Sequence, residues 1–196
     1  MGTRPDPVTP GFGRVAVRSD FWTIGHATRA LDEILALLAE HHIEQLVDVR
    51  TIPRSRHNPQ FNRETFAEAL AAAGLAYVHM PGLGGLRRPR PDSTNTGWRN
   101  PSFRGYADHM ETRDFEQNLL ALIGLARRRP TAIMCAEAVP WRCHRSLIAD
   151  ALAARGLRVT HVLGARRSSE HVLTPWARVD GARVRYATTE STPDLI

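Results

Sequence analysis

The sequence predicts an α/β protein of three layers, α/β/α, built on a mainly parallel sheet of about five strands. Short apolar runs typical of buried strands alternate with longer stretches whose apolar residues recur at helical spacing. Such alternation is typical of a parallel sheet covered by helices on both faces. A chain of 196 residues fits one domain, which we expect over residues 20–196, after a flexible tail rich in proline and glycine at 1–19.

The elements follow one another regularly as far as residue 163. We expect strands at 21–24, 46–49, 76–78, 132–134 and 158–163. Helices are expected at 30–41, 62–73, 103–128 and 141–155, the third of them broken near 111–114. Thr28 and Asn62 are the expected caps of the first two helices. The alternating segment 177–186, with Asp180-Gly181 at its centre, predicts a small C-terminal hairpin.

Composition points to an anionic partner. The net charge is +6, and because the chain has no lysine, all 26 basic residues are arginine. Arginine suits bidentate contact with phosphate, so a phosphate-bearing small molecule or a nucleic acid is the expected partner, although a merely solvated basic surface would look the same. Two cysteines make no disulfide framework, and no signal peptide or membrane span is evident, which favours the cytoplasm and no membrane contact. The sequence names no cofactor and no oligomeric state.

The stretch 131–156 holds both cysteines and most of the candidate chemistry. An apolar strand ends at Cys135, and the helix expected from Trp141 would place Cys143 and His144 in its first turn. A helix N-terminus with neighbouring cations favours a thiolate, so Cys143 is expected to react below the usual thiol pKa near 8.5, unless it is only a packing residue. The candidate catalytic residues are Cys135, Glu137, His144, Cys143 and His26.

Other candidates follow the remaining strands. His26 is either an acid–base group or a structural histidine, and Asp48 and Arg50 either bind substrate or hold each other. The candidate substrate-binding residues are Asp48, Arg50, Arg54, Arg56, Asn58, Gly84, Gly85, Arg142 and Arg145. Because parallel strands end at one edge of a sheet, we expect His26, Arg50, Cys135, Glu137 and His144 to surround one concavity.

Three functions remain open at this stage. The first is an enzyme acting on a phosphate-bearing substrate, with an anion held at the helix start near Arg142 and Arg145. The second is a nucleic-acid or nucleotide-binding module without catalysis, and the third is a metal-binding or thiol redox protein. Cys135, Glu137, Cys143 and His144 are all possible metal ligands, but adjacent residues on a helix diverge by about 100°, so no metal is expected.

The motifs are similar to those of a widespread prokaryotic domain family of unknown function. The resemblance is carried by Gly25-His26, the segment DVRTIPRSRHNPQF at 48–61, Leu83-Gly84-Gly85, Gly105-Tyr106 with Met110, and the pattern C-x-E-x5-C-H-R at 135–145. It implies one α/β domain with a shared site at these residues. It implies no activity, because none is established for that family.

Overall fold

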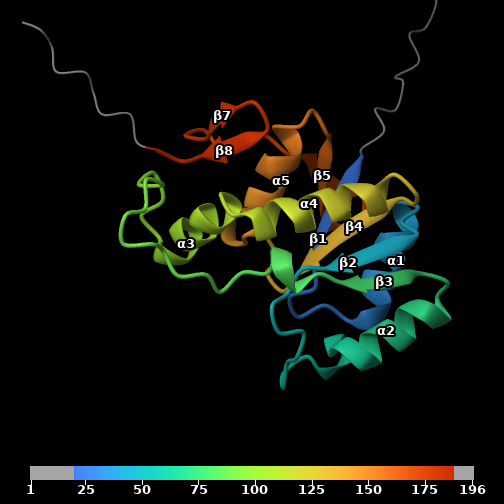
Figure 1. Ribbon diagram of the computed structural model, residues 1–196. Coiled ribbons are helices and arrows are strands. Elements are labelled where there is room, and N and C mark those ends of the chain that lie inside the picture. Colours follow the sequence, from blue (N-terminus) through green and yellow to red (C-terminus); the bar gives the residue numbers. More distant parts are fainter. Residues whose placement is uncertain (1–19, 188–196) are drawn as a thin grey trace, which may run out of the picture.

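A six-stranded sheet forms the centre of the protein, which we describe from a computed structural model over residues 20–187 (Figure 1). The tail predicted at 1–19 lies outside this range. The strand order is β3-β2-β4-β1-β5-β6. The strands are β1 (Phe21–Gly25), β2 (Gln45–Asp48), β3 (Ala76–His79), β4 (Thr131–Cys135), β5 (Val159–Gly164) and β6 (Arg167–Glu170). The first five run parallel and β6 runs antiparallel to β5, so the predicted mainly parallel sheet is confirmed.

Helices cover both faces of the sheet (Figure 1). They are α1 (Leu31–Glu40), α2 (Arg63–Ala72), α3 (Pro101–Met110), α4 (Arg113–Ala126) and α5 (Arg145–Ala153). One core cluster joins the sheet to α1 and α2, and the other joins it to α3, α4 and α5. Successive strand residues alternate between them, as in β4, where Ala132 and Met134 face the first cluster and Ile133 the second. The α/β/α layering is therefore confirmed.

Two expected helix caps are absent. Neither α1, which begins after Ala30, nor α2, which begins after Asn62, has a side-chain cap hydrogen bond. Thr28 lies outside the α1 terminus, and the Asn62 side chain instead accepts a hydrogen bond from the Ser55 backbone. The break between α3 and α4 is confirmed, and there the Thr112 hydroxyl does cap α4 by accepting from the Phe115 N–H.

The helix predicted to begin at Trp141 begins four residues later. A 3-10 turn at Pro140–Arg142 comes first, Cys143 is extended, and His144 is the residue before α5. Proline at the first position of the turn is compatible with a helical start, and it is the extended backbone of Cys143 that separates this turn from α5. This shift moves Cys143 out of the helix, so the expected divergence of Cys143 and His144 along a helix surface is wrong.

The long segment before α3 is held in place by one buried carboxylate. Asp108 of α3 accepts hydrogen bonds from the Arg90 backbone, the Ser93 hydroxyl and the Asn95 amide. In Figure 1 this green segment leaves the end of β3 and runs out beside α3, away from the strands.

The predicted C-terminal hairpin is present as β7 (Arg178–Asp180) and β8 (Arg183–Arg185). It lies beside α5 (Figure 1). Within residues 20–187, none of the helices combines the length and apolar character that crossing a bilayer requires.

Candidate functional site: a cysteine-centred cavity

A cavity of about 360 Å³ opens at the carboxyl edge of the sheet. Its polar side is formed by the end of β4 and the loop that follows, and its other side by the segments after β2 and β3 and by α3. The lining residues are Arg50, Thr51, Ile52, Gly85, Leu86, Ser102, Phe103, Tyr106, Cys135, Ala136, Glu137, Arg142, Cys143 and His144. Four of the five residues expected around one concavity, Arg50, Cys135, Glu137 and His144, are thus brought together.

Two thiols and an imidazole meet at the floor of this cavity. The Nδ1 atom of His144 lies 3.9 Å from the Cys135 sulfur and 3.8 Å from the Cys143 sulfur. All three atoms lie within 4.8 Å of one another. Both cysteines are buried and form no disulfide. Cys135 reaches this point as the last residue of β4, and Cys143 because its extended backbone turns the side chain back toward the strand.

The two thiols differ in acidity. A hydrogen bond from Cys143 lowers the pKa of Cys135 well below the usual thiol value, and contacts from His144 and the Glu137 N–H act in the same direction against the cost of burial. The same hydrogen bond, together with burial, raises the pKa of Cys143. The pKa of Cys143 thus shifts upward, opposite to the lowering that the sequence led us to expect for this thiol. The premise of that expectation was a helix N-terminus at Cys143, and α5 starts only at Arg145.

The His144 ring is fixed by its neighbours. A side chain at Gly85 would place its Cβ 2.9 Å from Nδ1, so only glycine lets this backbone approach the ring. Tyr106 packs against the ring with centroids 4.9 Å apart, and its own hydroxyl donates to the Leu83 carbonyl. The other nitrogen, Nε2, is buried and has no hydrogen-bond partner among the described residues. Nδ1 is therefore the ring nitrogen that contacts the two thiols.

Arg50 and Asp48 form a buried ion pair behind the cavity. The Arg50 Nη2 atom lies 2.6 Å from the Asp48 Oδ2 atom, and the Tyr77 hydroxyl donates to the same oxygen. His26 completes the group, because its Nε2 lies 3.2 Å from Arg50 Nη1 and its Nδ1 lies 3.0 Å from the Ala27 carbonyl. A guanidinium only donates, so Nε2 must accept and Nδ1 carries the hydrogen. Burial, followed by the charge of Arg50, lowers the pKa of His26, which fits this neutral form.

His26 and Asp48 therefore do not lie on the cavity wall, where the sequence led us to expect them. Neither lines the cavity, and both orient Arg50, which does. The Arg50 Nε–H and one Nη2–H donate to Asp48, and the other Nη2–H donates to the Phe61 carbonyl. One Nη1–H donates to His26. In the described part of the chain, one Nη1 hydrogen is left without a protein acceptor.

Arg145 is not available to a ligand, contrary to expectation. It is fully buried, and its guanidinium donates to the carbonyls of Ile24, Glu137 and Ala138. It thereby ties the β4–α5 loop to the end of β1. This tie needs glycine at position 25, because a Cβ there would lie 1.7 Å from the Glu137 carbonyl oxygen. Arg145 therefore holds the backbone of the site in place, with its guanidinium bound to three carbonyls and not exposed at the helix start.

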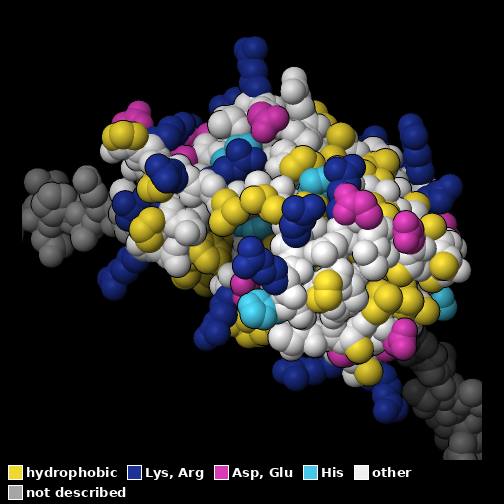
Figure 2. Space-filling model, turned by 90° about the horizontal axis from the view of Figure 1, so that it is seen from below, with side chains coloured by type: hydrophobic (Ala, Val, Ile, Leu, Met, Phe, Trp, Pro, Cys, Tyr) yellow, Lys and Arg dark blue, Asp and Glu magenta, His cyan; other side chains and the backbone are white. Residues whose placement is uncertain are grey.

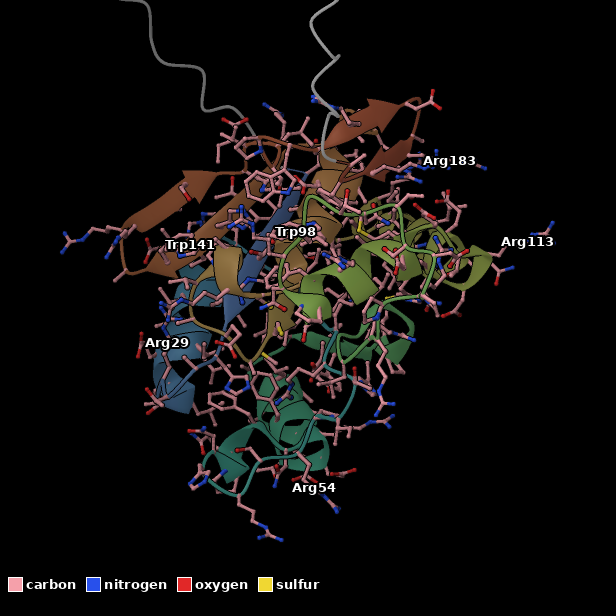
Figure 3. The ribbon with its side chains drawn as sticks, turned by 90° about the vertical axis from the view of Figure 1, so that its left-hand side faces the viewer. Arg29, Arg54, Trp98, Arg113, Trp141 and Arg183 are labelled. Carbon is pink, nitrogen blue, oxygen red and sulfur yellow. The ribbon has the colours of Figure 1, made fainter. Side chains whose placement is uncertain are left out.

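Some of the remaining candidate residues lie on the cavity wall, and the others lie away from the cavity. Glu137 and Arg142 are exposed on the wall. Arg54 and Arg56 are exposed and do not line the cavity, nor does the half-buried Asn58. Figure 3 shows Arg54 at the α2 end of the molecule, pointing outward. Gly84 lies behind the wall, against Thr51, whose hydroxyl donates to the Gly85 carbonyl.

Sequence reasoning missed the apolar side of the cavity. Ile52 and Leu86 are 66% and 81% exposed, and Phe103 and Tyr106 line the wall behind them. Exposed aliphatic side chains at a cavity mouth suggest contact with an apolar part of a ligand. The available signal was the position of Ile52 and Leu86 inside arginine- and glycine-rich loops, where an apolar residue has no core to enter.

Fold and site together define an α/β protein with two cysteines and a histidine at the ligand-binding edge of a parallel sheet. The chain belongs to the family described as "Domain of unknown function DUF488", whose model matches residues 30–152. This range includes Arg50, both cysteines and His144. No curated protein and no solved structure matches the chain.

Proposed function

We propose that the protein is an enzyme that uses Cys135 as a nucleophile on a phosphate-bearing substrate, a nucleotide or a nucleic acid. The observation that carries this proposal is the position of the Cys135 sulfur. It lies at the end of a central parallel strand, on a cavity wall, with Cys143 and His144 beside it. Thiolates are the reactive form of cysteine, and donors around the sulfur favour that form.

The cations around Cys135 support an anionic substrate. Arg142 is exposed on the same wall, and Arg50 has one N–H without a protein acceptor among residues 20–187. Because Asp48 and His26 fix the Arg50 guanidinium, this donor has a set direction before the substrate arrives. A cavity of about 360 Å³ lies in the range of small-ligand sites. The apolar wall of Ile52 and Leu86 would contact the uncharged part of the substrate.

The proposed reaction has two steps. The Cys135 thiolate attacks phosphorus, so an S–P bond forms while the ester P–O bond breaks, and the departing oxygen takes a proton from an acid on the wall. Water then attacks phosphorus, the S–P bond breaks, and phosphate and the thiolate are released. Glu137, two residues after Cys135 and exposed on the wall, is our candidate for the acid of the first step and the base of the second.

The test is product release from a panel of an aryl phosphate, nucleoside phosphates and single-stranded oligonucleotides. We expect Cys135→Ser to lower kcat by about 10³-fold or more, as loss of a nucleophile does. Arg142→Gln should mainly raise KM. Arg56→Gln is the matched control, because Arg56 is exposed and does not line the cavity. Activity that survives in Cys135→Ser would refute the proposal.

A binding module without catalysis would use the same arginines and gives a different result. It would bind oligonucleotides equally well in wild type and in Cys135→Ser, and neither protein would release product. On the face in Figure 2, basic side chains are scattered among apolar and neutral ones instead of forming a stripe. A continuous basic stripe is the usual footprint of nucleic-acid binding, so this face favours the enzyme over the module.

A further inference from the structure

We infer that Cys135, Cys143 and His144 form a binding site for a zinc-class divalent cation. The ligand atoms would be the two sulfurs and His144 Nδ1, which lie within 4.8 Å of one another. This goes beyond the proposed function and does not rest on it, because binding requires only these three atoms.

The two sulfur-to-nitrogen distances are close to those of tetrahedral coordination. With Zn–S bonds of about 2.3 Å and Zn–N bonds of about 2.0–2.1 Å at tetrahedral angles, a sulfur and a nitrogen ligand are about 3.6 Å apart. The two measured sulfur-to-nitrogen distances are 3.9 and 3.8 Å. Small side-chain rotations would close the difference. Two thiolates and one imidazole are a ligand set that zinc accepts, and it is far softer than the oxygen ligands that Mg²⁺ or Ca²⁺ prefer.

The ligands are also held in place from behind. Each sulfur accepts an N–H from the residue two positions further along the chain, Glu137 for Cys135 and Arg145 for Cys143. The His144 ring is clamped between Gly85 and Tyr106 with Nδ1 toward the sulfurs. Supporting contacts of this kind orient metal ligands and are a regular feature of metal sites.

Three protein ligands leave the fourth position open. All three residues line the cavity, so that position faces the space a small ligand would occupy. Bound metal would make the Cys135 sulfur a ligand instead of a free nucleophile. The metal-bound protein is therefore expected to resist alkylation at both cysteines, and a chelator should restore the reaction.

The test starts from reduced, chelator-treated protein titrated with Co²⁺. We expect one equivalent per chain to produce sulfur-to-cobalt charge-transfer absorption in the near ultraviolet and the visible bands of tetrahedral cobalt, both removed by Zn²⁺. Cys143→Ser and His144→Asn should weaken binding at least about 100-fold, since even residues behind the ligands are worth about 10–100-fold. His57→Asn, which changes an exposed histidine outside the cavity, should bind as wild type does.

Either of two results would overturn the inference. One is the absence of charge-transfer absorption in folded wild-type protein, which needs no variant. The other is absorption that persists in the Cys135→Ser/Cys143→Ser double variant, because the sulfurs would then not be ligands. These readouts are independent of turnover. If wild-type protein binds no cobalt but its activity is lost in Cys135→Ser, only the metal site is contradicted. If wild-type protein binds cobalt but its activity is unchanged in Cys135→Ser, only the proposed enzyme is contradicted.

Discussion

Arg145 shows how a single buried charge can shape a site without touching a ligand. Sequence alone suggested an anion-binding arginine, because Arg145 follows His144 near a predicted helix start. The structure places its guanidinium on three carbonyl oxygens at the junction of β1 and the β4–α5 loop. Nothing local in the sequence distinguishes it from the exposed Arg142. The difference arises only when β1 and β4 pair and bring Gly25 next to the loop.

The first residue-scale prediction concerns stability. Arg145→Leu should lower the free energy of unfolding by about 3 kcal/mol, because the carbonyls of Ile24, Glu137 and Ala138 would lose a buried donor. Arg142→Ala, three residues earlier and exposed, should change it by less than about 0.5 kcal/mol. Urea denaturation of both variants gives the two values. Similar losses in the two proteins would mean that Arg145 is not the structural tie.

The second concerns the acidity of Cys135. The hydrogen bond from Cys143 is the largest of the effects that lower the Cys135 pKa. Cys143→Ala removes it, so the pH at which Cys135 reaches half its maximal alkylation rate should rise. Mass spectrometry of iodoacetamide labelling against pH, in chelator-treated protein, measures this midpoint. An unchanged midpoint in the variant would show that Cys143 does not stabilise the thiolate.

At the scale of elements, prediction succeeded where a segment enters the core. The five parallel strands are short apolar runs, and each was expected within one or two residues of its observed bounds. β6 was missed because all four of its residues are exposed, so it carries no apolar pattern. The start of α5 was placed too early because the apolar spacing of its later turns does not show where a 3-10 turn gives way to a helix.

Helix capping gives an element-scale test with an internal comparison. Thr112 caps α4 through the Phe115 N–H, whereas Thr28 makes no cap contact with α1. Thr112→Ala should therefore cost about 1 kcal/mol of unfolding free energy and Thr28→Ala close to none. Thermal or urea unfolding of the two variants separates them. An equal effect of both substitutions would contradict the difference seen in the structure.

At the scale of the whole molecule, the strand topology made it possible to predict which residues meet at the cavity. The side-chain roles of these residues depend on tertiary contacts and could not be predicted. Residues as distant as Arg50 and Cys135 meet because parallel strands end at one edge. The roles of Asp48 and His26 depend on where side chains point after folding, which no spacing rule provides. The same holds for a second polar group, which includes Asp150 of α5. There Asp150, His171, His161 and Thr23 form one hydrogen-bonded chain.

This buried chain predicts how stability depends on pH. Burial, followed by the nearby charges of His171 and Arg145, lowers the pKa of His161 to about 3, although Asp150 opposes the shift. The unfolded protein has an ordinary histidine pKa near 6.5, so it binds a proton that the folded protein refuses. Stability from this group is therefore complete above about pH 6.5 and is lost progressively as the pH falls toward 3. The lowered pKa values of His26 and His109 act in the same direction.

The size of the effect follows from the same pKa difference. Between pH 8 and pH 5, His161 alone should reduce the free energy of unfolding by about 2 kcal/mol. His161→Gln keeps a polar side chain but cannot titrate, so its unfolding free energy should change by about 2 kcal/mol less over this interval. Urea denaturation of wild type and variant at the two pH values measures the difference. Parallel pH dependence in the two proteins would show that His161 is already able to accept a proton in the folded state, against the burial and hydrogen bonding described here.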